Sequence, residues 1–269
     1  MCKVLSVSRA GYYAWSTRQI SQRKLDDKRI LVLIKDVFKR SRDTYGYRRI
    51  LAALRDMNEI CSKHKILRLM RENNIRPKTR RKFKVTTNSK HNKPIHANSL
   101  DRQFNPQSPN QRWVADITYV PTSEGWLYLS IIMDLYSRKV IGWAMSDRMT
   151  DSIVTDALKM ALFRRKVRSD LLLHSDRGSQ YASYNMQQLL RNNKIECSMS
   201  RKGNCWDNAV AESFFHSLKT ECVYHERYLT RDNAKKSIFD YIEVFYNRQR
   251  RHSYLGYKSP EQYELSCGL

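Results

Sequence analysis

The spacing of apolar residues divides the chain into a helical first part and a strand-rich second part. Between residues 26 and 77, apolar residues recur every three or four positions, which predicts three amphipathic helices. The marking residues are Ile30, Leu31, Leu33, Ile34 and Val37, then Ile50, Leu51 and Leu54, and last Ile66, Leu67, Leu69 and Met70. Gly46 precedes the second helix, and Ser62 is a suitable N-cap for the third. Two short helices with a tight connection predict a helix-turn-helix-like segment at 45–75 inside a helical N-terminal region, 1–77.

Residues 78–108 differ from the regions on either side. The segment begins with the basic residues Lys78, Arg80, Arg81, Lys82 and Lys84. It continues into Thr, Asn, Ser and Pro with little hydrophobic periodicity. Such a composition predicts a basic linker.

From residue 112 the pattern is typical of strands. Three segments rich in Val, Ile, Tyr and Trp are Arg112–Val120, Trp126–Met133 and Val140–Met145, and their close spacing predicts three antiparallel strands. The apolar residues between Ile153 and Leu162 then predict a helix. Further along, the pattern predicts a strand at Leu171–Ser175, a helix at about Tyr184–Asn192, a strand at Ile195–Met199 and a helix from about Ala209. This order predicts an α/β domain at 109–269, with a mixed five-stranded sheet flanked by helices and a C-terminal helical extension. It matches the ribonuclease H-like architecture.

The net charge of the chain indicates what kind of partner it binds. Fifty Lys and Arg against 26 Asp and Glu give a net charge of +24, which destabilises a compact chain by self-repulsion and so favours a polyanionic partner. The third predicted helix carries basic residues opposite its apolar side, as a helix that reads a DNA groove does. These residues are Lys63, Lys65, Arg68 and Arg71. The alternative is an ordinary helical bundle with a solvated basic face, and the net charge favours DNA contact.

Composition and cysteine usage narrow the class of protein. Hydrophobic residues make up 41% of the chain, which is a globular composition. Apolar runs such as Leu127–Met133 are far shorter than the roughly 20 residues of a membrane span. The N-terminus lacks the pattern of an export signal. The six Cys form no CxxC pair, which disfavours a structural zinc site. We therefore expect a cytoplasmic protein with no membrane partner.

Three carboxylates are candidates for a metal site. Asp116 lies inside the first predicted strand, and Asp176 follows the strand Leu171–Ser175 at its C-terminal end, a common position for ligand sites. Glu212 lies on the last predicted helix of the sheet domain and shares a face with Lys219, seven residues on. A lone Asp at a strand end is more often a turn former. The joint placement of three carboxylates favours Mg²⁺, which prefers oxygen ligands and serves phosphodiester chemistry.

The sequence around these carboxylates resembles a known signature. The segments WVADITYV (113–120), HSDRGSQY (174–181) and NAVAESFFHSLKTE (208–221) resemble the acidic triad of retroviral integrases and bacterial insertion-sequence transposases, and 35 residues separate the second Asp from the Glu, as in that family. The resemblance is nearest to the second-reading-frame product of the IS3 group. It extends through residues 4–15, 45–75, 133–143, 200–209 and 246–264. The zinc-binding His/Cys set of retroviral integrases is absent, as in the insertion-sequence branch.

The resemblance implies a DNA transposase that cleaves and transfers strands at transposon ends. Asp116, Asp176 and Glu212 would coordinate two Mg²⁺ ions, for which Mn²⁺ substitutes. Lys219 matches a family position that contacts the DNA end. Lys202 is a further expected DNA contact, next to the position of the family's mobile loop at Gly203 and Asn204. Residues 109–269 would then be an integrase-type catalytic domain.

The resemblance also implies partners. We expect transposon ends and target DNA as substrates, a homo-oligomer on DNA, and a nucleoid-associated location in a bacterial cytoplasm. The chain opens at Met1, where the family's second reading frame begins, and no apolar heptad suggests a zipper. We therefore expect fusion or association with an upstream-reading-frame segment that recognises the ends. Two alternatives are a ribonuclease H-like nuclease without transfer activity and a DNA-binding regulator on an inactive core. A missing carboxylate would favour the regulator, and none is missing.

Overall fold

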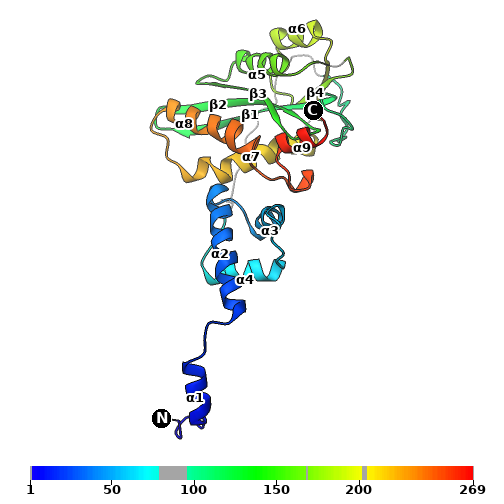
Figure 1. Cartoon of the computed structure of the whole chain (residues 1–269). Coiled ribbons are helices and arrows are strands. Elements are labelled where there is room, and N and C mark those ends of the chain that lie inside the picture. Colours follow the sequence, from blue (N-terminus) through cyan, green and yellow to red (C-terminus); the bar gives the residue numbers. More distant parts are fainter. Residues whose placement is uncertain (1, 79–95, 168, 202–204, 269) are drawn as a thin grey trace. The chain divides into compact units, whose positions relative to one another are not determined.

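The computed structural model describes residues 2–78, 96–167, 169–201 and 205–268 (Figure 1). The chain divides into two compact units, Met1–Pro77 and Lys78–Leu269, which are described separately. Residues 79–95 of the predicted basic linker and Lys202 lie outside the described residues.

The first unit contains four helices. They are α1 (Arg9–Ser16), α2 (Gln22–Arg40), α3 (Tyr47–Asp56) and α4 (Lys63–Glu72). The three predicted amphipathic helices are confirmed as α2, α3 and α4. Gly46 is the N-cap of α3, and the Ser62 hydroxyl accepts a hydrogen bond from the Lys65 backbone N–H at 3.2 Å, as an N-cap does.

The apolar stripes of α2, α3 and α4 form the core of this unit. Fully buried residues come from each of them, among them Ile34 in α2, Leu54 in α3 and Ile66 in α4. Helix α1 differs, because none of its residues is buried. The helix-turn-helix-like segment therefore rests on a small core shared with α2.

The second unit is built on a five-stranded mixed sheet. In chain order the strands are β1 (Arg112–Thr122), β2 (Gly125–Asp134), β3 (Val140–Ser146), β4 (Leu172–Ser175) and β5 (Glu196–Met199), and in the sheet they stand in the order β3-β2-β1-β4-β5. Strands β1, β2 and β3 pair antiparallel, while β4 pairs parallel with both β1 and β5. The predicted strands are confirmed, with ends that differ by one or two residues. This topology is the ribonuclease H-like fold predicted from the sequence.

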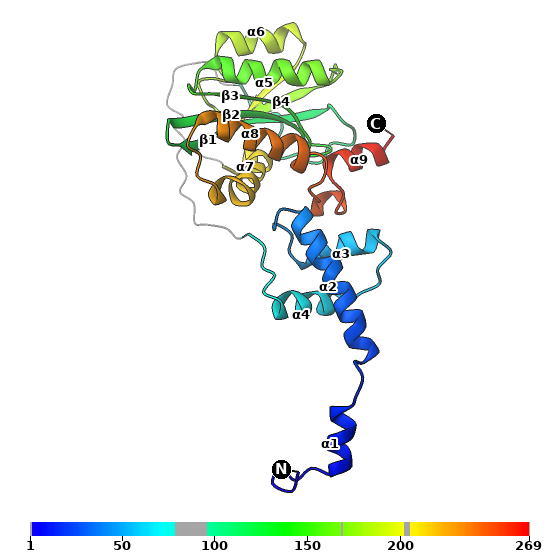
Figure 2. The same ribbon diagram turned by 60° about the vertical axis from the view of Figure 1, so that its left-hand side comes forward.

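Helices cover both faces of the sheet (Figures 1 and 2). Helices α5 (Asp151–Arg164) and α6 (Tyr184–Asn192) lie on one face, and α7 (Ala209–Glu221) and α8 (Arg231–Phe239) lie on the other. Trp113 and Ala115 of β1 pack into the core under α5 and α6. Because side chains alternate along a strand, Asp116 points to the opposite face, where α7 lies.

The remaining chain closes the ends of this domain. A π-helical segment (Asp240–Tyr246) and α9 (Pro260–Ser266) follow α8, with short 3-10 turns at Cys205–Asn208, Val223–His225 and Ser253–Leu255. Before the sheet, Leu100 is fully buried and its backbone N–H donates to the Ser198 hydroxyl at 3.1 Å. The end of the predicted linker thus packs on β5. In the described residues, we find no helix with the length and apolarity that crossing a bilayer requires.

Candidate active site

Sheet pairing brings Asp116 and Asp176 side by side. Strand β4 runs parallel to β1 with Val114 opposite His174. Two residues further along each chain lie Asp116, within β1, and Asp176, directly after the end of β4 at Ser175. Residues in register on parallel strands project to the same face of the sheet. The predicted juxtaposition of the first two carboxylates thus follows from the strand register.

A tight turn holds the Asp176 carboxylate. The Gly178 backbone N–H donates to Asp176 Oδ1 at 2.9 Å. A Cβ at Gly178 would lie 2.9 Å from the same oxygen, closer than real Cβ atoms come. The Tyr181 N–H closes the turn onto the Gly178 carbonyl at 3.0 Å, and the Gln180 amide donates to the Met149 carbonyl at 3.1 Å. The sequence motif thus encodes a turn in which a side chain at position 178 would displace the Asp176 carboxylate.

The charges around Asp116 oppose its ionisation. Burial raises the pKa of Asp116 well above its usual value, and the nearby charges of Asp176 and then Glu212 raise it further. The Ile117 backbone N–H, which donates to Asp116 at 2.8 Å, acts in the other direction. Burial also raises the pKa of Tyr181, together with the charges of Asp116 and Asp176. A carboxylate in such surroundings gains most from a cation.

Glu212 lies near the two aspartates without joining them in one cluster. It occupies the first turn of α7 and is exposed, and partial burial raises its pKa. Its charge acts on Asp116. In the part of the chain that the structure describes, no three His, Cys, Asp or Glu side chains lie close enough to hold a metal ion together. The structure therefore pairs Asp116 with Asp176 and places Glu212 at their margin.

Two residues before α7 secure its start, and sequence reasoning did not single them out. The Asn208 amide donates to the Ala115 carbonyl at 3.2 Å, next to Asp116. The Asp207 carboxylate is fully buried, and hydrogen bonds from Arg201 lower its pKa despite burial. Its oxygens also accept from Arg102 at 3.2 Å and from Asn98 at 2.9 Å. The sequence signal that could have identified Asp207 and Asn208 is their position, because both are polar residues directly before a predicted helix.

His174, two residues before Asp176, is a second unforeseen feature. It is fully buried between two hydroxyl groups, with Ser198 Oγ at 2.9 Å from Nδ1 and Ser200 Oγ at 3.2 Å from Nε2. Burial lowers the pKa of His174 to about 4, so the ring is neutral near pH 7. His174 thus ties β4 to β5 behind the Asp176 turn.

Lys219 of α7 is a buried cation beside the carboxylates. Only 8% of the residue is exposed. Its Nζ lies 5.0 Å from the centre of the Tyr119 ring. Burial lowers the pKa of Lys219, and the Asp116 carboxylate opposes that shift. This residue therefore brings a positive charge to the same face as Asp116.

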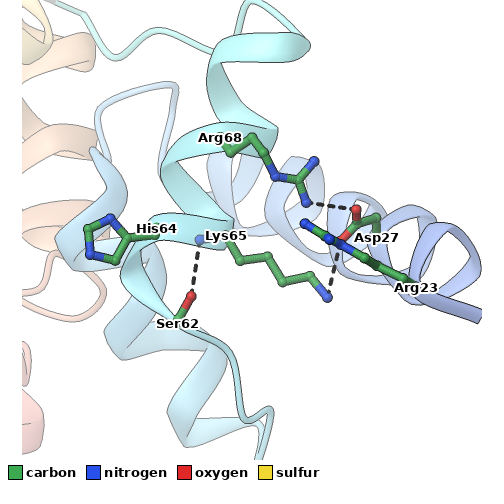
Figure 3. Close-up of a pocket in the computed structure, with 6 residues that line it drawn as sticks. All are labelled: Arg23, Asp27, Ser62, His64, Lys65 and Arg68. Atoms are coloured by element: carbon green, nitrogen blue, oxygen red, sulfur yellow. Dashed lines mark hydrogen bonds and ion pairs between the residues drawn. The ribbon is translucent and has the colours of Figure 1, made fainter.

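The four basic residues predicted on α4 divide into two pairs. Lys65 forms ion pairs with Asp26 and, at 3.2 Å, with Asp27 of α2, while Arg68 binds Asp27 at 2.7 Å (Figure 3). Lys63 and Arg71 are exposed. Lys65 and Arg68 therefore fasten α4 to α2, and the outer face of α4 presents Lys63 and Arg71.

Comparisons with known proteins agree with this architecture. The family "HTH-like domain" matches residues 24–83, and the family "Integrase core domain" matches residues 106–205 and again 212–266. An uncharacterized 31 kDa protein of insertion element IS600 from Shigella sonnei is 48% identical, covering 97% of this chain and 96% of that protein. The transposase InsF of insertion sequence IS3A from Escherichia coli is 44% identical, covering 98% and 92%.

Solved structures support the same fold. A chain of the simian T-cell lymphotropic virus intasome, solved in complex with the PP2A regulatory subunit B56 gamma, matches 79% of this chain and 69% of its own length at 20% identity and a TM-score of 0.50. That similarity shows the fold alone. The family is shown by the two insertion-element proteins, which are 44–48% identical to this chain over nearly its whole length. The chain belongs to the IS3 family of insertion-sequence transposases, with an HTH-like domain preceding an integrase catalytic core.

Proposed function

We propose that this transposase cleaves a DNA strand and transfers the freed 3′ end by phosphoryl transfer at Asp116, Asp176 and Glu212. The observation that carries the proposal is the parallel pairing of β1 and β4, which brings Asp116 near Asp176 at the end of β4, so that the charge of Asp176 acts on Asp116. The face they share is the one covered by α7, which bears Glu212. Three acidic groups in one electrostatic field repel one another, and a divalent cation relieves that repulsion.

The donor set fits magnesium or manganese. Only carboxylate oxygens are offered, which are the ligands that these hard cations prefer. When bound, the two ions that we propose would supply Lewis-acid polarisation of the phosphodiester. Asp116 and Asp176 would hold them, and Glu212 would complete the ligand set from α7. Lys219 would bind a phosphate oxygen of the DNA end, and the turn at Gly178 would keep the Asp176 carboxylate in position.

A strand-transfer assay tests the reaction class. A labelled, pre-cut DNA end is incubated with the protein, Mg²⁺ and a plasmid target, and joined products are separated by size. We expect the labelled strand to become covalently attached to the target. Shortened strands without joined product would instead assign the protein to the nucleases.

Metal dependence is a second expected result. Activity should be lost in chelator and return with Mg²⁺ or Mn²⁺, because both accept octahedral oxygen ligation. Ca²⁺ should support DNA binding with little turnover, because its longer and looser coordination misplaces the reacting oxygen. Initial rates after addition of each metal to the chelated protein give the measurement. Recovery with Zn²⁺ alone would contradict the proposed ligand set.

We propose that α4 makes phosphate contacts through its outer face. Of the predicted set, Lys63 and Arg71 should contribute more than Lys65 and Arg68, whose charges already pair with Asp26 and Asp27. An expected result follows for the double variant Lys63→Ala/Arg71→Ala. The slope of log affinity against log salt should become shallower by about 1.8, since each lost phosphate contact removes about 0.9.

The matched variant is Lys65→Ala/Arg68→Ala, which removes the same charge from the inner face of α4. Its slope should change less, while its unfolding temperature should fall because Asp27 loses both of the partners described above. Titrations from 50 to 200 mM salt and thermal melts separate the two effects. Equal slopes for the two double variants would refute the division of α4 into two faces.

Two further proposals concern assembly and location. The high positive charge supports DNA binding, and the family resemblance supports assembly of several copies on DNA at the bacterial nucleoid. End recognition by an upstream-reading-frame segment is proposed on the family resemblance alone. Competition binding of this chain to an inverted-repeat end and a scrambled duplex tests it, with affinities expected within about tenfold, or 1.4 kcal/mol.

A further inference from the structure

The hairpin between β1 and β2 carries an exposed tryptophan beside a second aromatic ring. Trp126 is 49% exposed. Its ring meets that of Tyr119 at 4.8 Å between centres and at 78°, an edge-to-face contact. Such contacts orient both rings. A large part of the indole therefore stays open to solvent in a defined orientation.

Contacts from the start of α8 and from the segment before it hold this hairpin in place. The Ser123 N–H donates to the Tyr228 carbonyl at 2.9 Å, and the Arg231 N–H donates to Glu124 at 2.8 Å. The Arg231 side chain also donates from Nε to the Trp126 carbonyl at 3.1 Å. At Gly125, with φ of +103°, a Cβ would lie 3.1 Å from that guanidinium group. The exposure of Trp126 thus belongs to an anchored turn.

Tyr119 connects this surface to the carboxylates. Its ring lies 5.0 Å from Lys219 Nζ, a cation–π distance, and Lys219 in turn acts electrostatically on Asp116. Trp126 pairs with Pro121, five residues beyond Asp116 on β1. At about 3.3 Å per residue, the backbone at Trp126 lies roughly 16 Å along the strand from the backbone at Asp116. That span corresponds to about five base steps of DNA at 3.4 Å each.

We propose that Trp126, supported by Tyr119, is a stacking site for an unpaired base of the DNA strand whose phosphate lies at the carboxylates. The inference rests on the proposed function and adds a subsite to it. An aromatic face beside a cation suits single-stranded nucleic acid, because each base offers a π-face and each phosphate a negative charge. A base within about five nucleotides of the reacting phosphate reaches the indole.

The test is a binding measurement without divalent metal, so that it does not depend on catalysis. Two DNA ends are compared: a duplex with a five-nucleotide single-stranded extension, and the same duplex with abasic residues in the extension. Trp126→Ala should weaken binding of the first end about tenfold, or 1.4 kcal/mol, and of the abasic end less than twofold. Trp126→Phe should recover most of the loss, because it restores an aromatic face.

Phe163→Ala is the matched control, since Phe163 is 93% exposed on α5, away from the β1–β2 hairpin. It should bind both ends as the parent protein does. The proposal is overturned if Trp126→Ala weakens binding to both ends equally, or leaves both unchanged. It is also overturned if the loss of DNA binding in Trp126→Ala is explained by a lower unfolding temperature or a changed oligomeric state of the variant measured without DNA. If the protein fails to transfer strands but still shows this base-dependent binding, the result contradicts the proposed reaction and supports the stacking site.

Discussion

Asp116→Asn is expected to reduce both strand cleavage and strand transfer more than a hundredfold. The amide keeps the size of the side chain and removes the charge that would hold a divalent cation. A loss of several kcal/mol of transition-state stabilisation corresponds to more than two powers of ten in rate. Asp176→Asn and Glu212→Gln should behave alike. Single-turnover rates on a pre-cut and an uncut transposon end measure the two steps separately.

The controls exclude misfolding and lost DNA binding as causes. Asp116 is a carboxylate whose ionisation the fold opposes, so the metal-free Asp116→Asn protein should unfold at the same or a higher temperature than the parent. DNA affinity should change little. Asp147→Asn, at an exposed position after β3, should retain full activity. A triad variant with more than about 1% of the parent rate would remove that residue from the proposed ligand set.

The sequence was sufficient to predict those features that depend on residues close together in the chain. Segments rich in Val, Ile, Tyr and Trp located β1, β2 and β3 to within two residues, and apolar residues spaced three and four positions apart located α2, α3 and α4. The position of Asp176 at the end of a strand followed from the apolar run before it and from Gly178 after it. Each of these signals depends on neighbours within a few positions of the chain.

Contacts between residues that are distant in the sequence could not be predicted from such local patterns. The helical pattern placed Lys65 and Arg68 off the apolar stripe, but their pairing with Asp26 and Asp27 depends on how α4 crosses α2. Asp207 is close in the chain to Arg201 and about a hundred residues from Asn98 and Arg102. Tertiary structure decides such contacts, and local sequence patterns do not predict them.

The C-terminal extension illustrates the same limit with a larger energetic effect. The sequence indicated helices after α7, without indicating what they contact. In the structure Arg250, 4% exposed, binds Glu221 of α7 through two hydrogen bonds of 2.6 Å. The Tyr241 hydroxyl donates to the same carboxylate at 2.8 Å. The extension is therefore joined to the helix that carries Glu212 by a buried charged network.

Arg250→Met is expected to lower the free energy of unfolding by about 3–5 kcal/mol, the usual cost of leaving one charge of a buried pair without its partner. Chemical denaturation gives the measurement. Arg248→Met is the matched control, because Arg248 is largely exposed and lies 3.8 Å from Glu261. It should cost less than about 0.5 kcal/mol.

A double variant decides whether the charge pair itself is responsible. If the cost of Arg250→Met comes from the unpaired Glu221 carboxylate, adding Glu221→Met should recover much of it, because apolar replacements of a buried pair are often close to neutral. If the second substitution deepens the loss, the network contributes through its hydrogen bonds to Tyr241 and to Ser217, which Arg250 also binds at 3.1 Å. A loss below about 1 kcal/mol for Arg250→Met alone would mean that the extension does not stabilise α7 through this pair.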